Sequence, residues 1–205
     1  MTRIIAGVHG GRRLSAPAGA QTRPTSDRVR EALFSSLETM TRLEGARFAD
    51  LYAGSGAVGL EALSRGATYA LLVESDARAA RSIRHNIAGL RVGPAARLIT
   101  GRVSQVLAVP PEGGPYDVVF ADPPYTLPDD ELAHVQKALV ANGWLATDAV
   151  VAIERSTRTA VRGEPGRHIG SATPQGGGGL RWIDGITPDR SKRYGETTLW
   201  YGRRS

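Results

Sequence analysis

A short apolar run that leads directly into a glycine-rich turn is the feature of this chain that most constrains its fold. The run covers residues 48–53, and Gly54-Ser55-Gly56-Ala57-Val58-Gly59 follows before a helical pattern begins. Glu74 ends the next apolar run. A Gly-x-Gly-x-x-Gly turn with an acid about 20 residues later is typical of a Rossmann-like unit that binds a nucleotide cofactor. We therefore expect a strand–turn–helix unit here, with Glu74 placed to accept two ribose hydroxyls.

The rest of the chain alternates between strand and helix patterns, which favours a parallel sheet. Ser26 is placed to cap a helix over residues 27–40, whose apolar residues form one stripe. The expected fold class is α/β: a Rossmann-like, seven-stranded, mostly parallel sheet with helices on both faces and an antiparallel C-terminal hairpin. The expected strands are 47–52, 69–74, 96–100, 116–121, 149–154, 180–183 and 197–201, and the expected helices are 27–40, 57–65, 76–89, 103–109 and 129–141.

The strand pattern over residues 116–121 ends abruptly in Asp122-Pro123-Pro124-Tyr125. Each proline fixes its own φ and disfavours a helical conformation for the residue before it, so this turn is rigid. At the end of a buried strand it would hold a carboxylate, backbone carbonyls and a ring around a small space. A planar base with an exocyclic amine fits that space. Taken alone, the motif is equally compatible with an ordinary strand-to-loop turn.

The glycine turn by itself cannot separate NAD from S-adenosylmethionine, because both present a ribose and an adenine. Asp50 precedes the glycines, where a carboxylate could face the cationic methionine portion of the cofactor. The Asp122 turn comes two strand patterns later, where the methyl group would point, and NAD has no use for it. Together these features favour S-adenosylmethionine, bound through Asp50, Gly54, Gly56 and Glu74.

The motifs and their order resemble the RsmD-like small-subunit ribosomal RNA (guanine-N2) methyltransferases, which are class I S-adenosylmethionine-dependent enzymes. The resemblance covers residue 3 to about residue 155, and beyond about residue 160 the chain departs from the family pattern. The matching blocks are Arg3-Ile4-Ile5-Ala6-Gly7, Gly11-Arg12-Arg13-Leu14, the segment Arg23–Phe34, the glycine turn with Leu60–Gly66, and the Asp122 turn.

This resemblance implies methylation of the exocyclic N2 amine of a guanine in 16S ribosomal RNA. Asp122 and the Pro123 carbonyl would accept the amine hydrogens while Tyr125 stacks on the base, and Thr25 and Asp122 would contact the cofactor. Two alternatives stay open. One is a DNA adenine-N6 or other DNA base methyltransferase, since the same turn serves that chemistry. The other is a non-catalytic nucleotide- or RNA-binding domain with the same fold.

Positive charge is concentrated at the N-terminus. The chain has 26 basic and 20 acidic residues. Residues 1–30 contain six of the basic residues and one of the acidic residues, so the rest of the chain contains 20 basic and 19 acidic residues. A basic arm ahead of a balanced domain is typical of a polyanion-binding extension. The alternative is a solvated arm, because arginine outnumbers lysine 24 to 2 throughout the chain. We expect residues 1–22, a basic arm or hairpin, to contribute modestly to the fold and mainly to RNA binding. The expected RNA contacts are Arg3, Arg12, Arg13, Arg23 and Arg28.

The amino-acid composition excludes several kinds of site and several classes of protein. The chain has no cysteine, which excludes disulfides and thiolate metal sites, and its four histidines show no metal-ligand spacing. There is no run of about 18 apolar residues and no signal-peptide layout. We expect residues 23–205 to form a single domain with a loop at 156–179. The expected protein is a cytoplasmic, metal-free monomer that acts on ribosomal RNA or a partly assembled small ribosomal subunit.

Overall fold

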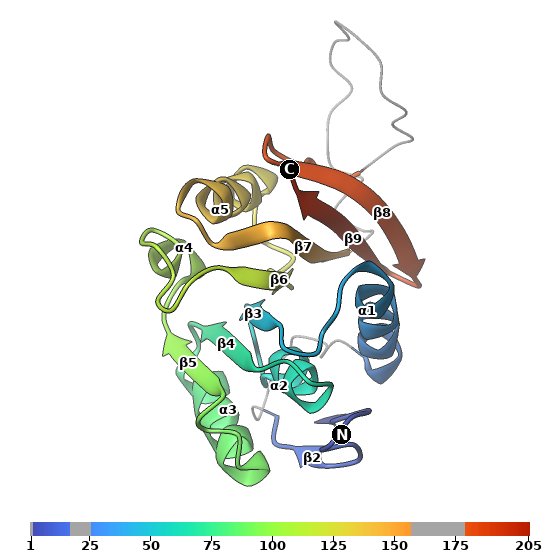
Figure 1. Cartoon of the computed structure of the whole chain (residues 1–205), viewed down its shortest axis with the longest axis vertical. Helices are drawn as coiled ribbons and strands as arrows, with labels where there is room; N and C mark the ends of the chain where they lie inside the picture. Colours follow the sequence, from blue (N-terminus) through green and yellow to red (C-terminus); the bar gives the residue numbers. More distant parts are fainter. Residues whose placement is uncertain (1, 17–25, 157–178) are drawn as a thin grey trace, which may run out of the picture.

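The computed structural model describes residues 2–16, 26–156 and 179–205. Its centre is a seven-stranded sheet in the order β5-β4-β3-β6-β7-β9-β8 (Figure 1). β9 runs antiparallel to both β7 and β8, and the remaining neighbours are parallel. The expected α/β class with an antiparallel C-terminal hairpin is therefore confirmed. The strands of this sheet are β3 (Arg47–Leu51), β4 (Tyr69–Glu74), β5 (Ala96–Thr100), β6 (Tyr116–Ala121), β7 (Leu145–Ser156), β8 (Ile186–Tyr194) and β9 (Thr197–Arg204).

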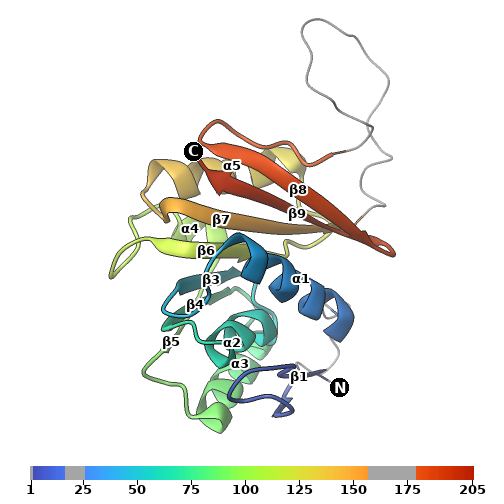
Figure 2. The ribbon, with the colours of Figure 1, turned by 45° about the vertical axis from the view of Figure 1, so that its right-hand side comes forward.

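Helices cover both faces of the sheet (Figure 2). One face packs against α1 (Asp27–Met40), α2 (Ala57–Ser64) and α3 (Ala77–Leu90), and the other against α4 (Val103–Val106) and α5 (Asp129–Ala141). Alternate residues of β3 supply the two cores, with Phe48 in the first and Leu51 in the second. Because both faces are covered, the central strands are continuously apolar in sequence rather than alternating.

Helix α1 begins and ends at the residues that its cap and its periodicity predict. The Ser26 hydroxyl accepts a hydrogen bond from the Val29 N–H at 3.3 Å, which satisfies one of the free donors at the helix start. The apolar stripe of Val29, Leu33 and Leu37 is buried against the sheet. Local signals were sufficient here because cap and stripe agree.

The strand expected at residues 180–183 is wrong. The apolar residues of that segment pack without strand pairing against the core beside α4 and α5, and the strand lies at β8 instead. β8 is an exposed edge strand of mostly polar residues, so no alternating apolar pattern marks it. Strand β7 also begins earlier than expected, at Leu145, and α4 ends at Val106 rather than at residue 109. Residues 157–178, nearly all of the expected loop, lie outside the described part.

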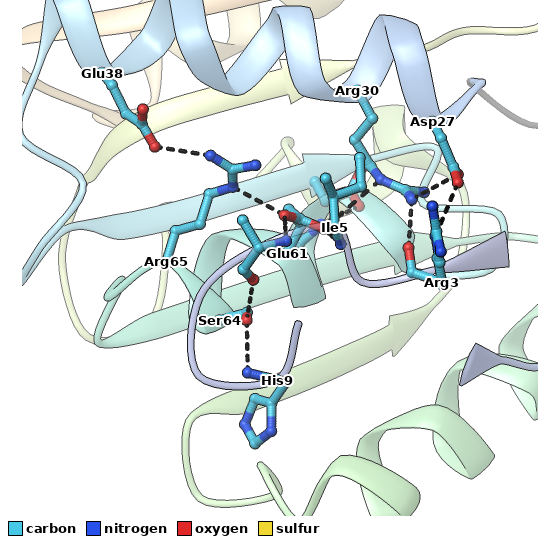
Figure 3. Close-up of polar contacts among 12 residues, drawn as sticks. Arg3, Ile5, His9, Asp27, Arg30, Glu38, Glu61, Ser64 and Arg65 are labelled. Carbon is cyan, nitrogen blue, oxygen red and sulfur yellow. Dashed lines mark hydrogen bonds and ion pairs between the residues drawn. The ribbon is translucent and has the colours of Figure 1, made fainter. Parts of the chain in front are cut away.

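The short strands β1 (Thr2–Arg3) and β2 (Arg13–Leu14) pair antiparallel, so residues 2–16 form an N-terminal hairpin. This hairpin is joined closely to α2 (Figure 3). Ile4 is fully buried, and the N–H groups of Ile5 and Ala6 donate to the Glu61 carboxylate at 2.7 and 2.9 Å. The expectation that this segment contributes only modestly to the fold is wrong, because its side chains enter the core and its backbone satisfies a buried charge.

Candidate active site

The carboxyl ends of β3, β4 and β6 meet at one edge of the sheet. The Ala53 N–H donates to the Val73 carbonyl at 2.9 Å, and the Asp122 N–H donates to the Leu51 carbonyl at 3.4 Å. Parallel neighbours therefore bring the glycine turn, Glu74 and the Asp122 turn to the same edge. Open α/β sheets bind their ligands at such an edge, where the strand order reverses direction.

The glycine turn approaches the sheet too closely for larger residues. Gly54 and Gly56 have φ values of 57° and 78°, in the left-handed region that favours glycine. A Cβ atom on Gly56 would lie 2.8 Å from the Leu72 side chain, and one on Gly59 would lie 3.2 Å from Asp50 Cβ. The glycines thus form both the tight turn and the close contact between α2 and the sheet.

Asp50, which the sequence predicted to face the cofactor, also has a role within the protein. Its side chain is buried, and its Oδ2 accepts a hydrogen bond from the Gly59 N–H at 2.8 Å. Gly56, the residue before α2, has no side chain to cap that helix, so Asp50 caps it from β3. Burial raises the pKa of Asp50 to about 7; the Gly59 hydrogen bond opposes this shift and the nearby Glu74 charge adds to it. A direct contact between Asp50 and the cofactor stays a prediction.

Glu74 uses both carboxylate oxygens to hold backbone around the site. Its Oε2 accepts from the Gly54 N–H and its Oε1 from the Asp76 N–H, each at 2.8 Å. Asp76 in turn caps α3 by accepting from the N–H groups of Arg78 and Ala79. A carboxylate has about four acceptor positions, so Glu74 can hold the glycine turn and still accept ribose hydroxyls.

The residues of the Asp122 turn differ in their exposure to solvent. Asp122 is half-buried, Pro123 is buried, and Tyr125 is 51% exposed. The carboxylate therefore lies at the sheet edge, whereas the ring lies at the surface. This arrangement suits a base that enters from solvent and contacts the ring first.

The segment behind this turn is held by Arg155, a residue at the end of β7 that sequence reasoning missed. Its guanidinium donates to the Leu127 carbonyl at 3.3 Å and to Asp129 Oδ1 at 2.7 Å. The Arg155 side chain is only 9% exposed. One arginine thus fixes both the loop after the Asp122 turn and the start of α5.

A cavity of about 660 Å³ opens beside these motifs, between α4 and α5. Ser75, which follows Glu74, and Leu127 both line it. Tyr52 lines it too and has a φ of 64°, a conformation that costs a residue with a side chain about 1–2 kcal/mol. Strained residues of this kind cluster at functional sites. The cavity has the size of small-molecule and cofactor sites.

Comparison with known proteins identifies the family. The family model described as "Conserved hypothetical protein 95" matches residues 2–172. The chain belongs to this family. The curated relative "Ribosomal RNA small subunit methyltransferase D" of Escherichia coli (strain K12) is 41% identical over 152 residues, which cover 74% of this chain and 73% of the relative. The protein of the same name from Haemophilus influenzae is 35% identical over 153 residues, 74% and 77% of the two chains.

A solved structure of the Escherichia coli protein yhhF superimposes with a TM-score of 0.76 and 33% identity, covering 99% of this chain and 97% of that one. The resemblance to RsmD-like proteins that the sequence motifs indicated is thus confirmed, and so is the Rossmann-like fold.

Two of the arginines expected to contact RNA have partners within the protein. Arg3 forms an ion pair with Asp27 at 3.5 Å, and Arg12 donates to the Gly89 carbonyl at the end of α3 at 2.9 Å. Both side chains belong to exposed residues, so these contacts orient them without burying them.

The other residues that the sequence predicted to contact RNA or the cofactor are Arg13, Arg23, Arg28 and Thr25. Arg13 and Arg28 are exposed residues on the hairpin and on α1. Arg23 and Thr25 lie outside the described residues. The roles of all five arginines in RNA binding, and of Thr25 in cofactor binding, stay predictions.

Asn86 on α3 is a further residue that sequence reasoning missed. Its Nδ2 donates to the carbonyls of Ser15 and Ser55, each at 2.9 Å, and its Oδ1 accepts from the Ser15 N–H at 2.7 Å. It therefore ties the hairpin to the glycine turn. The available signal was an amide on the otherwise apolar stripe of a predicted helix.

Within residues 2–16, 26–156 and 179–205, no group of three or more histidine, aspartate or glutamate side chains could hold a metal ion. None of the helices described there is long and apolar enough to cross a membrane.

Proposed function

We propose that this protein transfers a methyl group from S-adenosylmethionine to the exocyclic N2 amine of a guanine in small-subunit ribosomal RNA. The observation that carries the proposal is the meeting of the glycine turn, Glu74 and the Asp122 turn at one edge of the sheet. The names of the curated relatives support methylation of small-subunit ribosomal RNA. They do not favour the DNA methyltransferase or the non-catalytic alternative.

The residues at this edge fit the cofactor. Glu74 retains acceptor positions for the ribose hydroxyls, and the left-handed glycines bring backbone close to a ligand. A Cβ at Gly56 would lie 2.8 Å from the Leu72 side chain and one at Gly59 would lie 3.2 Å from Asp50, so the turn packs tightly against the sheet. The cavity next to Ser75 offers space for the adenine. Bound S-adenosylmethionine supplies an electrophilic methyl group on a sulfonium.

The Asp122 turn would act on the amine that is methylated. The lone pair of a guanine exocyclic amine is delocalised into the ring, so the amine is a poor nucleophile. Asp122 accepts one amine hydrogen and the Pro123 carbonyl accepts the other. Both hydrogen bonds strengthen as positive charge develops on nitrogen, which favours the transition state over the ground state. Tyr125 stacks on the base, and positioning contributes much of the rate.

The base must leave its stack to reach this turn, so the target is an unpaired or flipped nucleotide. We propose that residues 23–205 act as one domain with the N-terminal hairpin packed into its core, that the protein works in the cytoplasm as a monomer, and that it recognises either free ribosomal RNA or a partly assembled small subunit. No metal is required for the chemistry assigned to these residues.

The test is transfer of a tritiated methyl group to small-subunit particles from cells that lack the protein, followed by nucleoside analysis. N2-methylguanosine in the digested RNA is the expected product. Naked 16S RNA and duplex DNA run in parallel separate the substrate classes. Methylation of DNA alone, or of adenine rather than guanine, would overturn the proposal.

A further inference from the structure

The charge of this chain is uneven in a second place besides the N-terminus. No acidic residue occurs between Asp76 and Glu112, although this stretch contains six arginines. Beyond residue 30 the basic and acidic residues nearly balance in number, but residues 77–111 are strongly basic and the other residues together carry a net negative charge. The arginines are Arg78, Arg81, Arg84, Arg91, Arg97 and Arg102.

Helix α3 presents three of these arginines on one face. Its inward face is buried against the sheet through Ala79, Ala80, Ile83, Asn86 and Leu90. Arg78, Arg81 and Arg84 are exposed on the opposite side. Among the described residues, Arg84 donates to the Thr100 hydroxyl at 3.1 Å, and no carboxylate pairs with any of the three.

This face connects the candidate active site to the hairpin. α3 begins at Asp76, whose N–H is held by Glu74, and near its other end the Gly89 carbonyl accepts from Arg12 of the hairpin. The 14-residue helix spans about 21 Å at 1.5 Å per residue. The α3 arginines therefore lie on a helix that runs from the proposed cofactor site to Arg12 of the hairpin, on which Arg13 is also exposed.

The arrangement weakens the helix that carries it. Arg78 lies in the first turn of α3, where the helix dipole disfavours a positive charge, although the Asp76 cap offsets part of this effect. Arg78, Arg81 and Arg84 also follow one another at a spacing of three, where like charges cost about 0.2–0.5 kcal/mol per pair. A face selected only for solubility would intersperse acids, so an anionic ligand is the better account of it.

We propose that the outward face of α3, together with Arg12 and Arg13, binds the phosphate backbone of the ribosomal RNA beside the nucleotide that is methylated. Guanidinium groups bind phosphate oxygens in a bidentate manner, and Arg78, Arg81 and Arg84, which span about 9 Å along the helix axis, can contact neighbouring phosphates. This inference rests on the proposed function. It adds an RNA-binding surface on α3 to the one predicted on the hairpin, and it places the bound RNA next to the active-site edge.

The test compares two variants of the full-length protein with equal charge changes. The first is Arg78→Gln/Arg81→Gln/Arg84→Gln. The control is Arg42→Gln/Lys137→Gln/Lys192→Gln, which removes three exposed positive charges from α5, β8 and the segment after α1. RNA affinity is measured by fluorescence anisotropy with a 16S fragment from about 50 to 300 mM salt.

The α3 variant should bind RNA about tenfold or more weakly, and the slope of log K against log salt should fall by about 2–3, since each lost phosphate contact removes a little under one unit. Its S-adenosylmethionine affinity and its kcat at saturating RNA should match wild type, while its KM for RNA rises. Arg78→Lys/Arg81→Lys/Arg84→Lys should restore most of the slope.

If the α3 variant and the control show the same slope and KM, the inference is overturned while the methyltransferase assignment stands. If wild type methylates no RNA but its RNA affinity depends on the α3 arginines, the surface stands and the proposed function fails. Thermal unfolding of each variant identifies any loss of fold, and relief of like-charge repulsion predicts that the α3 variant is at least as stable as wild type.

Discussion

Arg30 Nε lies 3.8 Å from Glu61 Oε2, and neither side chain is exposed to solvent (Figure 3). This buried ion pair joins α1 to α2, and Glu61 also holds the hairpin backbone at Ile5 and Ala6. Arg30 also donates to the Arg3 carbonyl and to Asp27. Burial lowers the pKa of Arg30, with Glu61 and Asp27 opposing that shift. Three segments far apart in sequence thus depend on one carboxylate.

Glu61→Ala should lower the free energy of unfolding by about 3–5 kcal/mol, because it leaves the buried Arg30 with only the partly exposed Asp27 as an ion-pair partner and removes the acceptor of the Ile5 and Ala6 N–H groups. Urea unfolding measures this loss. Glu38→Ala is the control: Glu38 also pairs with a neighbouring arginine, Arg65, but is 49% exposed, so less than about 1 kcal/mol should be lost. Equal losses of unfolding free energy in the two variants would show that the buried ion pair contributes no more to stability than the exposed one. Deleting residues 1–15 should likewise reduce stability, contrary to what the sequence alone indicated.

Asp50→Asn should flatten the pH dependence of stability between about pH 4 and pH 7. The folded-state pKa of Asp50, raised by burial to about 7, exceeds that of an unfolded aspartate, about 3.9. The folded protein therefore binds the proton more tightly, so this contribution to stability is complete below about pH 4 and is lost as pH rises through 7. An asparagine still accepts the Gly59 hydrogen bond but does not titrate. The check is the difference between urea unfolding curves of the two proteins across this range; a difference independent of pH would contradict the assignment.

Glu74→Ala should weaken S-adenosylmethionine binding by about 1.5–3 kcal/mol, the scale of a hydrogen bond to a charged group. Isothermal titration calorimetry measures the change. Asp76→Ala is the matched control, since Asp76 caps α3 two residues away but is assigned no contact with the cofactor. Unchanged affinity in Glu74→Ala, or an equal loss in both variants, would count against the ribose role of Glu74.

Asp122→Ala should lower kcat about 10²-fold while cofactor affinity stays nearly intact, because the variant removes a hydrogen bond that strengthens in the transition state. Tyr125→Ala should instead raise the KM for RNA, since the exposed ring captures the base. Single-turnover methylation at saturating RNA separates the two effects. Full turnover by Asp122→Ala under these conditions would mean that the amine binds elsewhere.

Arg155→Met should lower kcat by about 10–100-fold with little change in cofactor affinity, since small displacements of a catalytic turn are costly to the rate. Arg155 acts as a positioning residue, through the Leu127 carbonyl and Asp129. Arg203→Met is the control, because Arg203 on neighbouring β9 makes similar contacts to the Met40 carbonyl and Asp189 away from the Asp122 turn. If both variants lose the same activity, Arg155 serves stability in general rather than the turn.

Much of the fold was predictable because its signals are local. The cap at Ser26, the glycines of the turn and the apolar runs of the parallel strands each specify their own element. Parallel pairing then places the carboxyl ends of β3, β4 and β6 at one edge, so the meeting of Glu74 and Asp122 followed from the order of elements. β8 was not predictable in this way, because an exposed polar edge strand is defined by its pairing with β9 rather than by its own composition.

The sequence by itself therefore determined the fold class, the family and the residues that meet at the candidate site. Tertiary structure decided what several of those residues do there: Asp50 caps α2, Glu74 holds the glycine turn, and the hairpin becomes part of the core through Glu61. Each of these roles is a contact between residues distant in the chain. Secondary-structure patterns record how a segment folds along its own axis, whereas the partner of a buried carboxylate depends on which distant donors the packed chain brings within hydrogen-bond reach.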